Sequence, residues 1–343
     1  MKRFTLGDGL RGVAAIGVVA LHTHLPLPFA MINAYWPDFF FVLSGLVLAK
    51  YFDPSKTKPS FKLFAAKRIV RFYPLVFCAV LTMLAFTYAQ LHLGTAAEWP
   101  DRLSLPRVLA ALALLQILSV SVTWVMVPLW SLSAELLINL TAYWPVRRFG
   151  TPLLIALPIL GFIVELIRIP QYSSLPDHIW QPITGVMSLA RVSIGFSLGL
   201  LIARYPAGGV RPIWLAASLV VFGIFVVSPN PDAHQLAAPF VYALLLRELV
   251  PLEPRFAATR MSKFAGFLGT SSFGIYVWHP AFLAVTYAIG ARFAHYLPIP
   301  REVTNFVIVL SLTLIATRIT YRWVERPTMR WINSRTKIAA VAE

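Results

Sequence analysis

Near its start the chain has an arginine and a histidine whose spacing would place both side chains on one face of a helix. Arg11 and His22 are eleven residues apart, about three helical turns, so they share one helix face with about 16 Å of rise between them. An imidazole titrates near neutral pH and can take a proton from a hydroxyl group. His22 is therefore a candidate general base. The alternative is a histidine that packs between helices through a hydrogen bond.

A second group of basic residues follows at Arg68 and Arg71. They are three residues apart, which makes them neighbours on a helix face. Paired guanidinium groups suit phosphates, because each presents a planar fork of N–H donors. The alternative, that both side chains anchor a helix among lipid headgroups, depends on the elements that carry them.

Two further ionisable residues lie in apolar surroundings. Glu135 ends the run WSLSAE at 130–135, where a carboxylate can pair with a buried arginine or belong to a site. His279 follows Tyr276 by three residues and precedes a proline that frees a backbone carbonyl. An aromatic belt at a membrane surface would explain Tyr276 without any chemistry.

The composition indicates which elements position these residues. Of 343 residues, 58% are apolar and 13% are charged, which excludes an ordinary soluble globular protein. A single cysteine, Cys78, excludes a disulfide framework and a thiolate metal site. The net charge of +16 would suggest nucleic acid for a soluble protein, but in a membrane protein it more often marks cytoplasmic loops.

Apolar runs of the length needed to cross a bilayer recur along the whole chain. We expect them at about 10–27, 36–50, 72–93, 107–127, 129–145, 152–168, 184–203, 212–228, 236–250, 267–290 and 303–324. They lack the alternation of barrel strands, so helices are the spans that satisfy the backbone in lipid. The sequence predicts an all-α, polytopic integral membrane helix bundle. We expect one membrane domain over 1–330, a basic cytoplasmic tail over 331–343 and no separate soluble domain.

The placement of Lys and Arg distinguishes between topologies. If 107–145 crosses once, most basic residues fall on one side, and the other side keeps Arg102, Arg107, Arg168, Arg292 and Arg301. If 107–145 crosses twice, the two sides carry nearly equal charge. The positive-inside rule therefore favours about ten transmembrane crossings plus a re-entrant segment, with both termini cytoplasmic. Either 107–127 or 129–145 is the full crossing.

Together these motifs resemble the bacterial integral-membrane acyltransferase-3 family. The resemblance covers nearly the whole chain and rests on six motifs in the family's order. They are DGLRG at 8–12 with His22, FFFVLSG at 39–45, RIVRFYP at 68–74, WSLSAE at 130–135, SFGIYVWH at 272–279 and ERP at 325–327. The chain departs from the pattern at Gly7, at Phe273 and at Leu136, where the family often has a second acid.

The resemblance implies a membrane O-acyltransferase in the bacterial cytoplasmic (inner) membrane. It would move an acyl group, usually acetyl in this family, from cytoplasmic acyl-CoA to a hydroxyl of a cell-surface or exported polysaccharide or lipid-linked sugar. Acyl-CoA is then a co-substrate, and no metal or bound cofactor is implied. The expected partners are a carbohydrate or glycolipid acceptor, the lipid bilayer and a separate periplasmic protein; nucleic acid is not expected.

The resemblance also assigns roles to residues. His22 becomes the expected general base and Glu135 a second catalytic residue that orients or polarises it. The CoA phosphates are expected to bind Arg11, Arg68 and Arg71. The candidate acceptor-binding or structural residues are Asp8, Ser44, Tyr276 and His279.

Two other functions stay open. One is a tailoring acyltransferase for a glycosylated small molecule. The other is a transporter or flippase with a buried histidine and arginines as its coupling site. Transporters commonly contain internal repeats, and this sequence shows no repeat period. Its basic motifs gather at one membrane face, which favours acyl-CoA.

Overall fold

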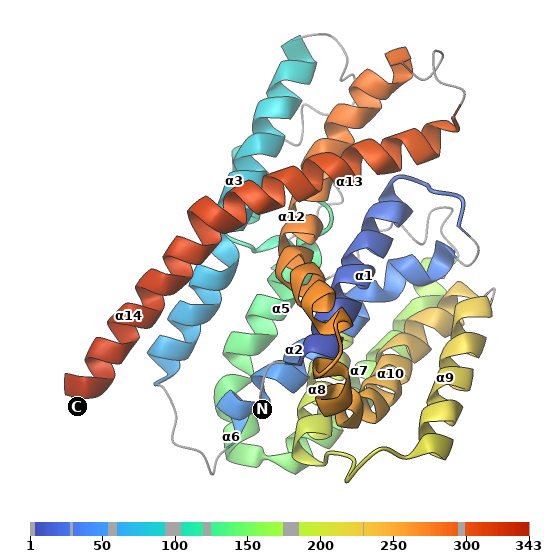
Figure 1. Cartoon of the computed structure of the whole chain (residues 1–343), viewed down its shortest axis with the longest axis vertical. Helices are drawn as coiled ribbons and strands as arrows, with labels where there is room; N and C mark the ends of the chain where they lie inside the picture. The colour runs from blue at the N-terminus through green and yellow to red at the C-terminus, as the bar shows by residue number, and fades with distance from the viewer. Residues whose placement is uncertain are drawn as a thin grey trace.

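The computed structural model describes residues 4–27, 30–53, 60–92, 104–118, 125–173, 185–228, 230–293 and 299–342. Every regular element within these ranges is a helix, as the sequence predicts (Figure 1). The α-helices are α1 (Thr5–His22), α2 (Trp36–Phe52), α3 (Phe61–His92), α4 (Leu105–Leu112), α5 (Leu129–Thr141), α6 (Tyr143–Phe149), α7 (Thr151–Ser173), α8 (Gly185–Arg204), α9 (Pro212–Val227), α10 (Pro231–Leu249), α11 (Glu253–Ala257), α12 (Met261–Phe293), α13 (Arg301–Thr320) and α14 (Arg326–Ala342). A π-helical turn, η6 (Tyr321–Glu325), joins α13 to α14.

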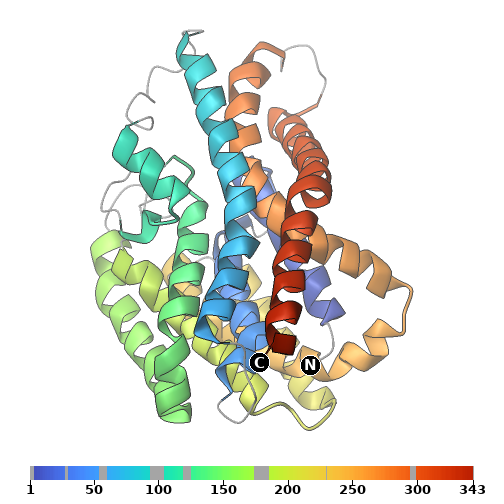
Figure 2. The same ribbon diagram turned by 90° about the vertical axis from the view of Figure 1, so that its left-hand side faces the viewer.

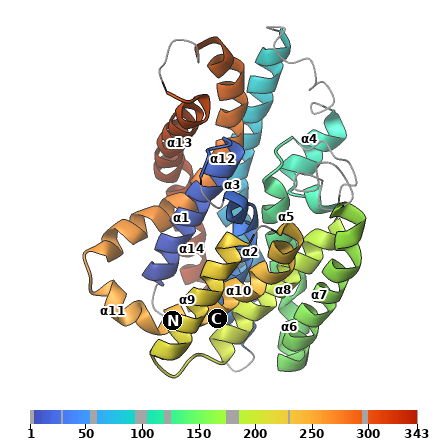
Figure 3. The same ribbon diagram turned by 90° about the vertical axis from the view of Figure 1, so that its right-hand side faces the viewer.

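Several of these helices have the length and composition of membrane spans. Four segments qualify by both measures: Phe61–His92, Gly185–Arg204, Asp232–Ala257 and Arg301–Ser334. Thr151–Ile167 and Pro212–Val227 are apolar but shorter. These helices agree with a membrane protein. The ten crossings and the side on which the termini lie stay predictions, although the start of α1 and the end of α14 lie toward the same end of the molecule (Figures 2 and 3).

The two halves of the 107–145 region differ in structure. Its first half contains α4, whose eight residues rise only about 12 Å, and a turn in which Leu114 has a φ of 52°. Residues 119–124 lie outside the described residues. The second half contains α5 and α6, separated only at Ala142. The second half is therefore the better candidate for a crossing.

Helices α1 and α12 run in parallel and in close contact. A Cβ atom added to Gly9 would lie 2.9 Å from the Cβ of Ala265, and one added to Gly12 would lie 2.4 Å from that of Leu268. Small residues at such positions let two helix backbones approach closely within a membrane. This packing fixes which residues of α1 face which residues of α12.

Helix α2 makes a similar contact with α8. The backbone of Gly45 passes the carbonyl group of Phe196, and Gly199 passes that of Val42, with no room for a Cβ at either glycine. A buried ion pair between Asp38 and Arg191 joins the same two helices. Helix α2 is therefore held firmly, with Ser44 on the side facing α5.

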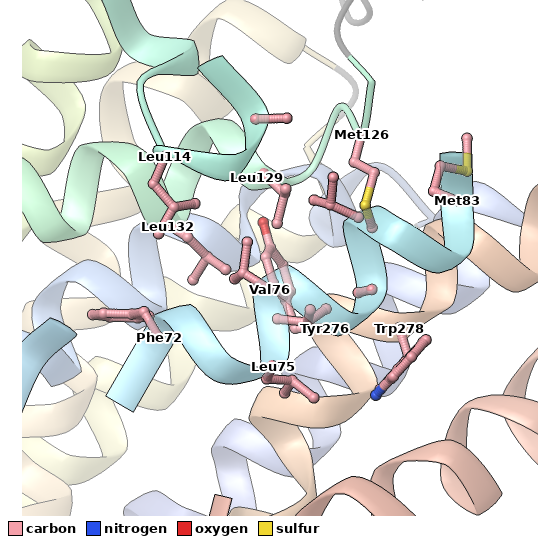
Figure 4. Packing of buried hydrophobic residues seen from close by; sticks show 14 of the residues in the cluster. Phe72, Leu75, Val76, Met83, Leu114, Met126, Leu129, Leu132, Tyr276 and Trp278 are labelled. Atoms are coloured by element: carbon pink, nitrogen blue, oxygen red, sulfur yellow. The ribbon is translucent and has the colours of Figure 1, made fainter. Parts of the chain in front are cut away.

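A hydrophobic core joins α3, α5 and α12. Val76 of α3 and Leu129 of α5 are fully buried there, with the ring of Tyr276 of α12 beside them (Figure 4). Helix α14 also contacts α3. The candidate site residues of five different helices are thus brought around one point of the bundle.

Candidate active site

Six of the nine predicted site residues line one cavity of about 530 Å³. They come from α1, α2, α3, α5 and α12, and they are Arg11, Ser44, Arg68, Arg71, Glu135 and Tyr276. Helix α14 adds Met329 and Asn333 to the wall. The basic residues of the wall also include Lys50 and Lys67, whereas Glu135 is its one carboxylate among the described residues. The cavity therefore suits a polyanionic ligand.

Glu135 joins three helices through its carboxylate. Its Oε1 accepts a hydrogen bond of 2.7 Å from Ser44 Oγ and lies 3.5 Å from Arg68 Nη2. Both ionised side chains are mostly buried, and a buried guanidinium group is stable only when a partner compensates its charge. Glu135 bonds to Ser44 and Arg68 rather than to His22, so the structure does not bring Glu135 and the expected base together.

Arg71 pairs with a residue far along the chain. Its Nη1 donates to Oε2 of Glu325 at 3.1 Å, and its guanidinium lies 4.7 Å from the ring centre of Phe273. Glu325 ends the π-helical turn η6. Turns of this kind are rare and often occur at functional sites.

Arg11 lies against α12. Its Nη2 donates to Ser272 Oγ at 3.0 Å and to the carbonyl of Gly269 at 3.4 Å. Its Nη1 lies 4.0 Å from the carboxylate of Asp8, three residues earlier on the same helix. These contacts hold the guanidinium at the wall of the cavity, and they give Asp8 a structural part in the site.

His22 and His279 contact each other. Their ring centres are 5.1 Å apart. In each ring Nδ1 lies near the carbonyl one turn earlier, at 2.8 Å from Val18 for His22 and 3.2 Å from Ile275 for His279. A nitrogen bonded to a carbonyl must carry the proton, so in a neutral ring Nε2 holds the lone pair. His279 is fully buried, and its Nε2 has no hydrogen-bond partner among the described residues.

Tyr276 connects the cavity to this pair of histidines. It lines the cavity, and its ring centre lies 5.9 Å from that of His279. Its hydroxyl is 2.6 Å from Ser131 Oγ and 3.0 Å from the carbonyl of Pro128. The ring of Phe40 packs edge-on against it at 5.6 Å. The tyrosine is therefore held in place between the basic cavity and the two imidazoles.

Sequence reasoning missed three residues of this site. Ser131 and Ser272 bond to Tyr276 and Arg11, and each lies one helical turn before a predicted site residue, Glu135 or Tyr276. That spacing is a signal that could have identified both serines. Glu325 belongs to a motif of the sequence, but its bond to Arg71 depends on the fold.

Comparison with known proteins identifies the family of the chain. A family model described as an acyltransferase domain matches residues 8–322. The exopolysaccharide production protein ExoZ of Rhizobium meliloti (strain 1021) is 29% identical over 320 residues, which cover 91% of this chain and 94% of that protein. Protein 2 in the picA locus of Rhizobium radiobacter is 33% identical over 164 residues, or 43% of this chain and 84% of that protein. No solved structure matches significantly. Because the family model covers nearly the whole chain, the chain belongs to the acyltransferase-3 family and is an acyltransferase.

Proposed function

We propose that the protein moves an acetyl group from cytoplasmic acetyl-CoA to a hydroxyl of an exported or cell-surface polysaccharide or of a lipid-linked sugar. The observation that carries this proposal is the basic cavity beside two contacting imidazoles. Similarity over most of both chains to an exopolysaccharide production protein supports a polysaccharide-related acceptor. In this proposal the bundle lies in the bacterial inner membrane, and the cavity opens to the cytoplasm.

The donor fits the site by charge and by length. Arg11, Arg68 and Arg71 bind the phosphates of CoA through charge-assisted hydrogen bonds. From Arg11 the helix rises about 16 Å to His22. The pantetheine arm of CoA has about 13 bonds between phosphorus and sulfur, which extend over about 16 Å at the advance per bond of a stretched chain. A phosphate held at Arg11 therefore allows the thioester to reach His22.

The reaction follows from the state of the His22 ring. Its Nε2 takes the proton of the acceptor hydroxyl while that oxygen attacks the thioester carbonyl. The C–O bond forms and the C–S bond breaks. The thiolate of CoA leaves and takes the proton back from His22, so the products are the sugar ester and free CoA. General-base catalysis of this kind contributes about 10²–10⁴-fold to a rate.

His279 assists His22 after the proton has moved. An unpaired buried acceptor such as its Nε2 costs about 1–3 kcal/mol. His22 becomes positively charged as it takes the proton, and the lone pair of the neighbouring His279 ring carries negative partial charge. An attraction that develops only as the proton moves stabilises the transition state more than the ground state. His279 is therefore a positioning residue for His22 in this mechanism.

The remaining predicted residues hold the donor-binding arginines. Glu135 and Ser44 support Arg68, and Asp8 lies near Arg11. Tyr276 forms the wall past which the acetyl group moves from the cavity toward His22. The catalytic part expected for Glu135 thus becomes support of Arg68 and Ser44.

The test uses inverted membrane vesicles that contain the protein and radiolabelled acetyl-CoA. Label is expected in a polysaccharide or lipid-linked sugar fraction with the wild type and with His92→Ala, which removes an exposed histidine at the end of α3. The same label should be lost with His22→Ala at equal protein content. Label in a small glycoside instead would replace the polysaccharide acceptor by a tailoring function. Equal labelling by His22→Ala and the wild type would overturn the assignment of the base.

A further inference from the structure

The exposed side of α13, of η6 and of the start of α14 carries a second basic hollow. Its volume is about 510 Å³, and it is lined by Arg318, Ile319, Tyr321, Arg322, Trp323 and Arg326. None of these residues lines the candidate active-site cavity. Tyr321 and Arg326 also line a neighbouring hollow that contains Arg11 and Arg71, so the second basic hollow lies next to the candidate active site without sharing its cavity.

The π-helical turn helps to keep three arginines of this hollow on one face. Arg318, Arg322 and Arg326 are spaced by four residues, and each such step exceeds an α-helical turn of 3.6 residues by about 40° of rotation. The wider turn of η6, with bonds from residue i to i+5, reduces this drift. Glu325 of the same turn points the other way, into its ion pair with Arg71.

The charge of the hollow is uncompensated within the described structure. All three arginines are exposed, and none has a carboxylate partner among the described residues. Arg318 lies over the ring of Phe267 at 5.5 Å, and Arg322 lies over that of Trp323 at 5.5 Å. A guanidinium group stacked on a ring can still present its N–H edge to a phosphate. Three such groups around one hollow favour an anion.

The position along the helix identifies the source of that anion. Helix α13 exposes apolar side chains such as Val307 and Ile315, at 55% and 57% of their full surface, as a lipid-facing helix does. Past its end, Trp323 is 70% exposed and Trp331 is 54% exposed. Exposed tryptophans next to an apolar span mark the headgroup level of a bilayer. Arg318 lies between these two zones, and Arg322 and Arg326 flank Trp323 at the headgroup level, where phospholipid phosphates are found.

We propose that this hollow binds the phosphate of an anionic phospholipid. Basic pockets at the cytoplasmic ends of membrane helices bind such headgroups, and the hollow supplies three guanidinium groups with two aromatic side chains beside them. This lipid site does not share the cavity that is proposed to bind acyl-CoA. The bound headgroup would also neutralise the positive charge of Arg322 and Arg326. These arginines lie in and next to η6, the turn whose Glu325 pairs with Arg71.

The test places the full-length protein in lipid nanodiscs and titrates brominated phosphatidylglycerol into phosphatidylcholine. Bromine quenches nearby tryptophan, and the difference between the wild type and Trp323→Phe isolates the signal of Trp323. Brominated phosphatidylcholine at the same fraction gives the background of random contact. At about fivefold per arginine, replacing all three arginines by Gln should weaken phosphatidylglycerol binding about a hundredfold.

A matched variant controls for the loss of charge. Arg255, Arg260 and Lys263 are exposed on and after α11, and their joint replacement by Gln removes the same charge from another place. This control should bind phosphatidylglycerol like the wild type. Equal weakening in both triple variants, or equal quenching by the two brominated lipids, would overturn the lipid site.

Complete displacement by inorganic phosphate at low millimolar concentration would assign the hollow to a soluble phosphate instead. If the triple Gln variant does not fold, Arg322→Gln alone replaces it: binding about fivefold weaker than that of the wild type supports the lipid site, and unchanged binding overturns it.

Discussion

The imidazole rings of His22 and His279 lie 5.1 Å apart, each with Nδ1 held by the carbonyl group one helical turn earlier. This arrangement follows from the parallel packing of α1 and α12, which also places Arg11 against Ser272. One pair of helices thus carries both the phosphate-binding end and the proton-accepting end of the proposed reaction.

Replacing His279 tests the second imidazole. The amide of His279→Gln can reach the region of Nε2, whereas His279→Phe fills the space without any acceptor. We expect His279→Phe to lower kcat about tenfold to a hundredfold, from the loss of an interaction of about 1–3 kcal/mol. His279→Gln should keep a larger part of the rate. The measurement is kcat and KM for acetyl-CoA, with KM expected to change little.

A purely structural role of His279 would give a different pattern. Both variants would then lower the amount of folded protein, and the kcat of the remaining folded protein would equal that of the wild type. Size-exclusion chromatography of the purified variants separates the two cases.

The helical class and most of the candidate site could be predicted from the lengths of the apolar runs and from the spacing of residues on a helix face. Arg68 and Arg71 share a helix face by spacing alone, and both line the cavity. Helix α3, however, begins at Phe61, well before the apolar run expected at 72–93. The amphipathic turns that carry the basic motif continue the helix without being apolar, so hydropathy did not include them.

Other features depend on tertiary packing and left no local signal. The role expected for Glu135, to orient or polarise His22, depended on the position of α5, which turns the carboxylate toward Ser44 and Arg68. The buried pair of Asp38 and Arg191 joins helices that are far apart in the sequence. Both residues look costly in an apolar segment, but only the fold shows which charge compensates which.

Arg68 and Arg71 are expected to determine donor affinity. Arg68→Ala and Arg71→Ala should each raise the KM for acetyl-CoA about tenfold or more, because a hydrogen bond to a charged group contributes about 1.5–3 kcal/mol. Dephospho and pantetheine thioesters lack some or all of the phosphates, so their KM values should change less. Unchanged acetyl-CoA affinity in both variants would leave the two arginines as anchors of α3.

Variants of Arg71 and Glu325 can distinguish a role in the stability of the protein from a role in binding acetyl-CoA. Glu325→Ala leaves Arg71 without its carboxylate partner and should lower the thermal midpoint of the protein, since breaking a buried ion pair costs up to about 3–5 kcal/mol. Arg71 is 28% exposed in its side chain, so the loss should lie below that range. Exchanging the two residues, as Arg71→Glu with Glu325→Arg, should recover part of the midpoint.

The exchanged variant should nevertheless bind acetyl-CoA poorly, because it places a carboxylate where a phosphate is expected. Recovery of both stability and affinity would show that Arg71 acts only through its pairing with Glu325. Isothermal titration with CoA and a thermal melt of the same preparation give the two quantities.

The close contact of α1 with α12 is the last feature that can be tested by a single change. A Cβ on Gly12 would lie 2.4 Å from the Cβ of Leu268 and 3.0 Å from its carbonyl carbon. Gly12→Ala must therefore push the two helices apart. We expect a loss of stability of about 1–3 kcal/mol from overpacking and a larger fractional loss of kcat, because separation moves His22 away from His279. Gly223→Ala in α9 is the matched control, since nothing lies within 4 Å of its added Cβ; it should leave activity unchanged and stability equal or slightly higher. A normal kcat in folded Gly12→Ala protein would show that catalysis does not require the two imidazoles to stay in contact.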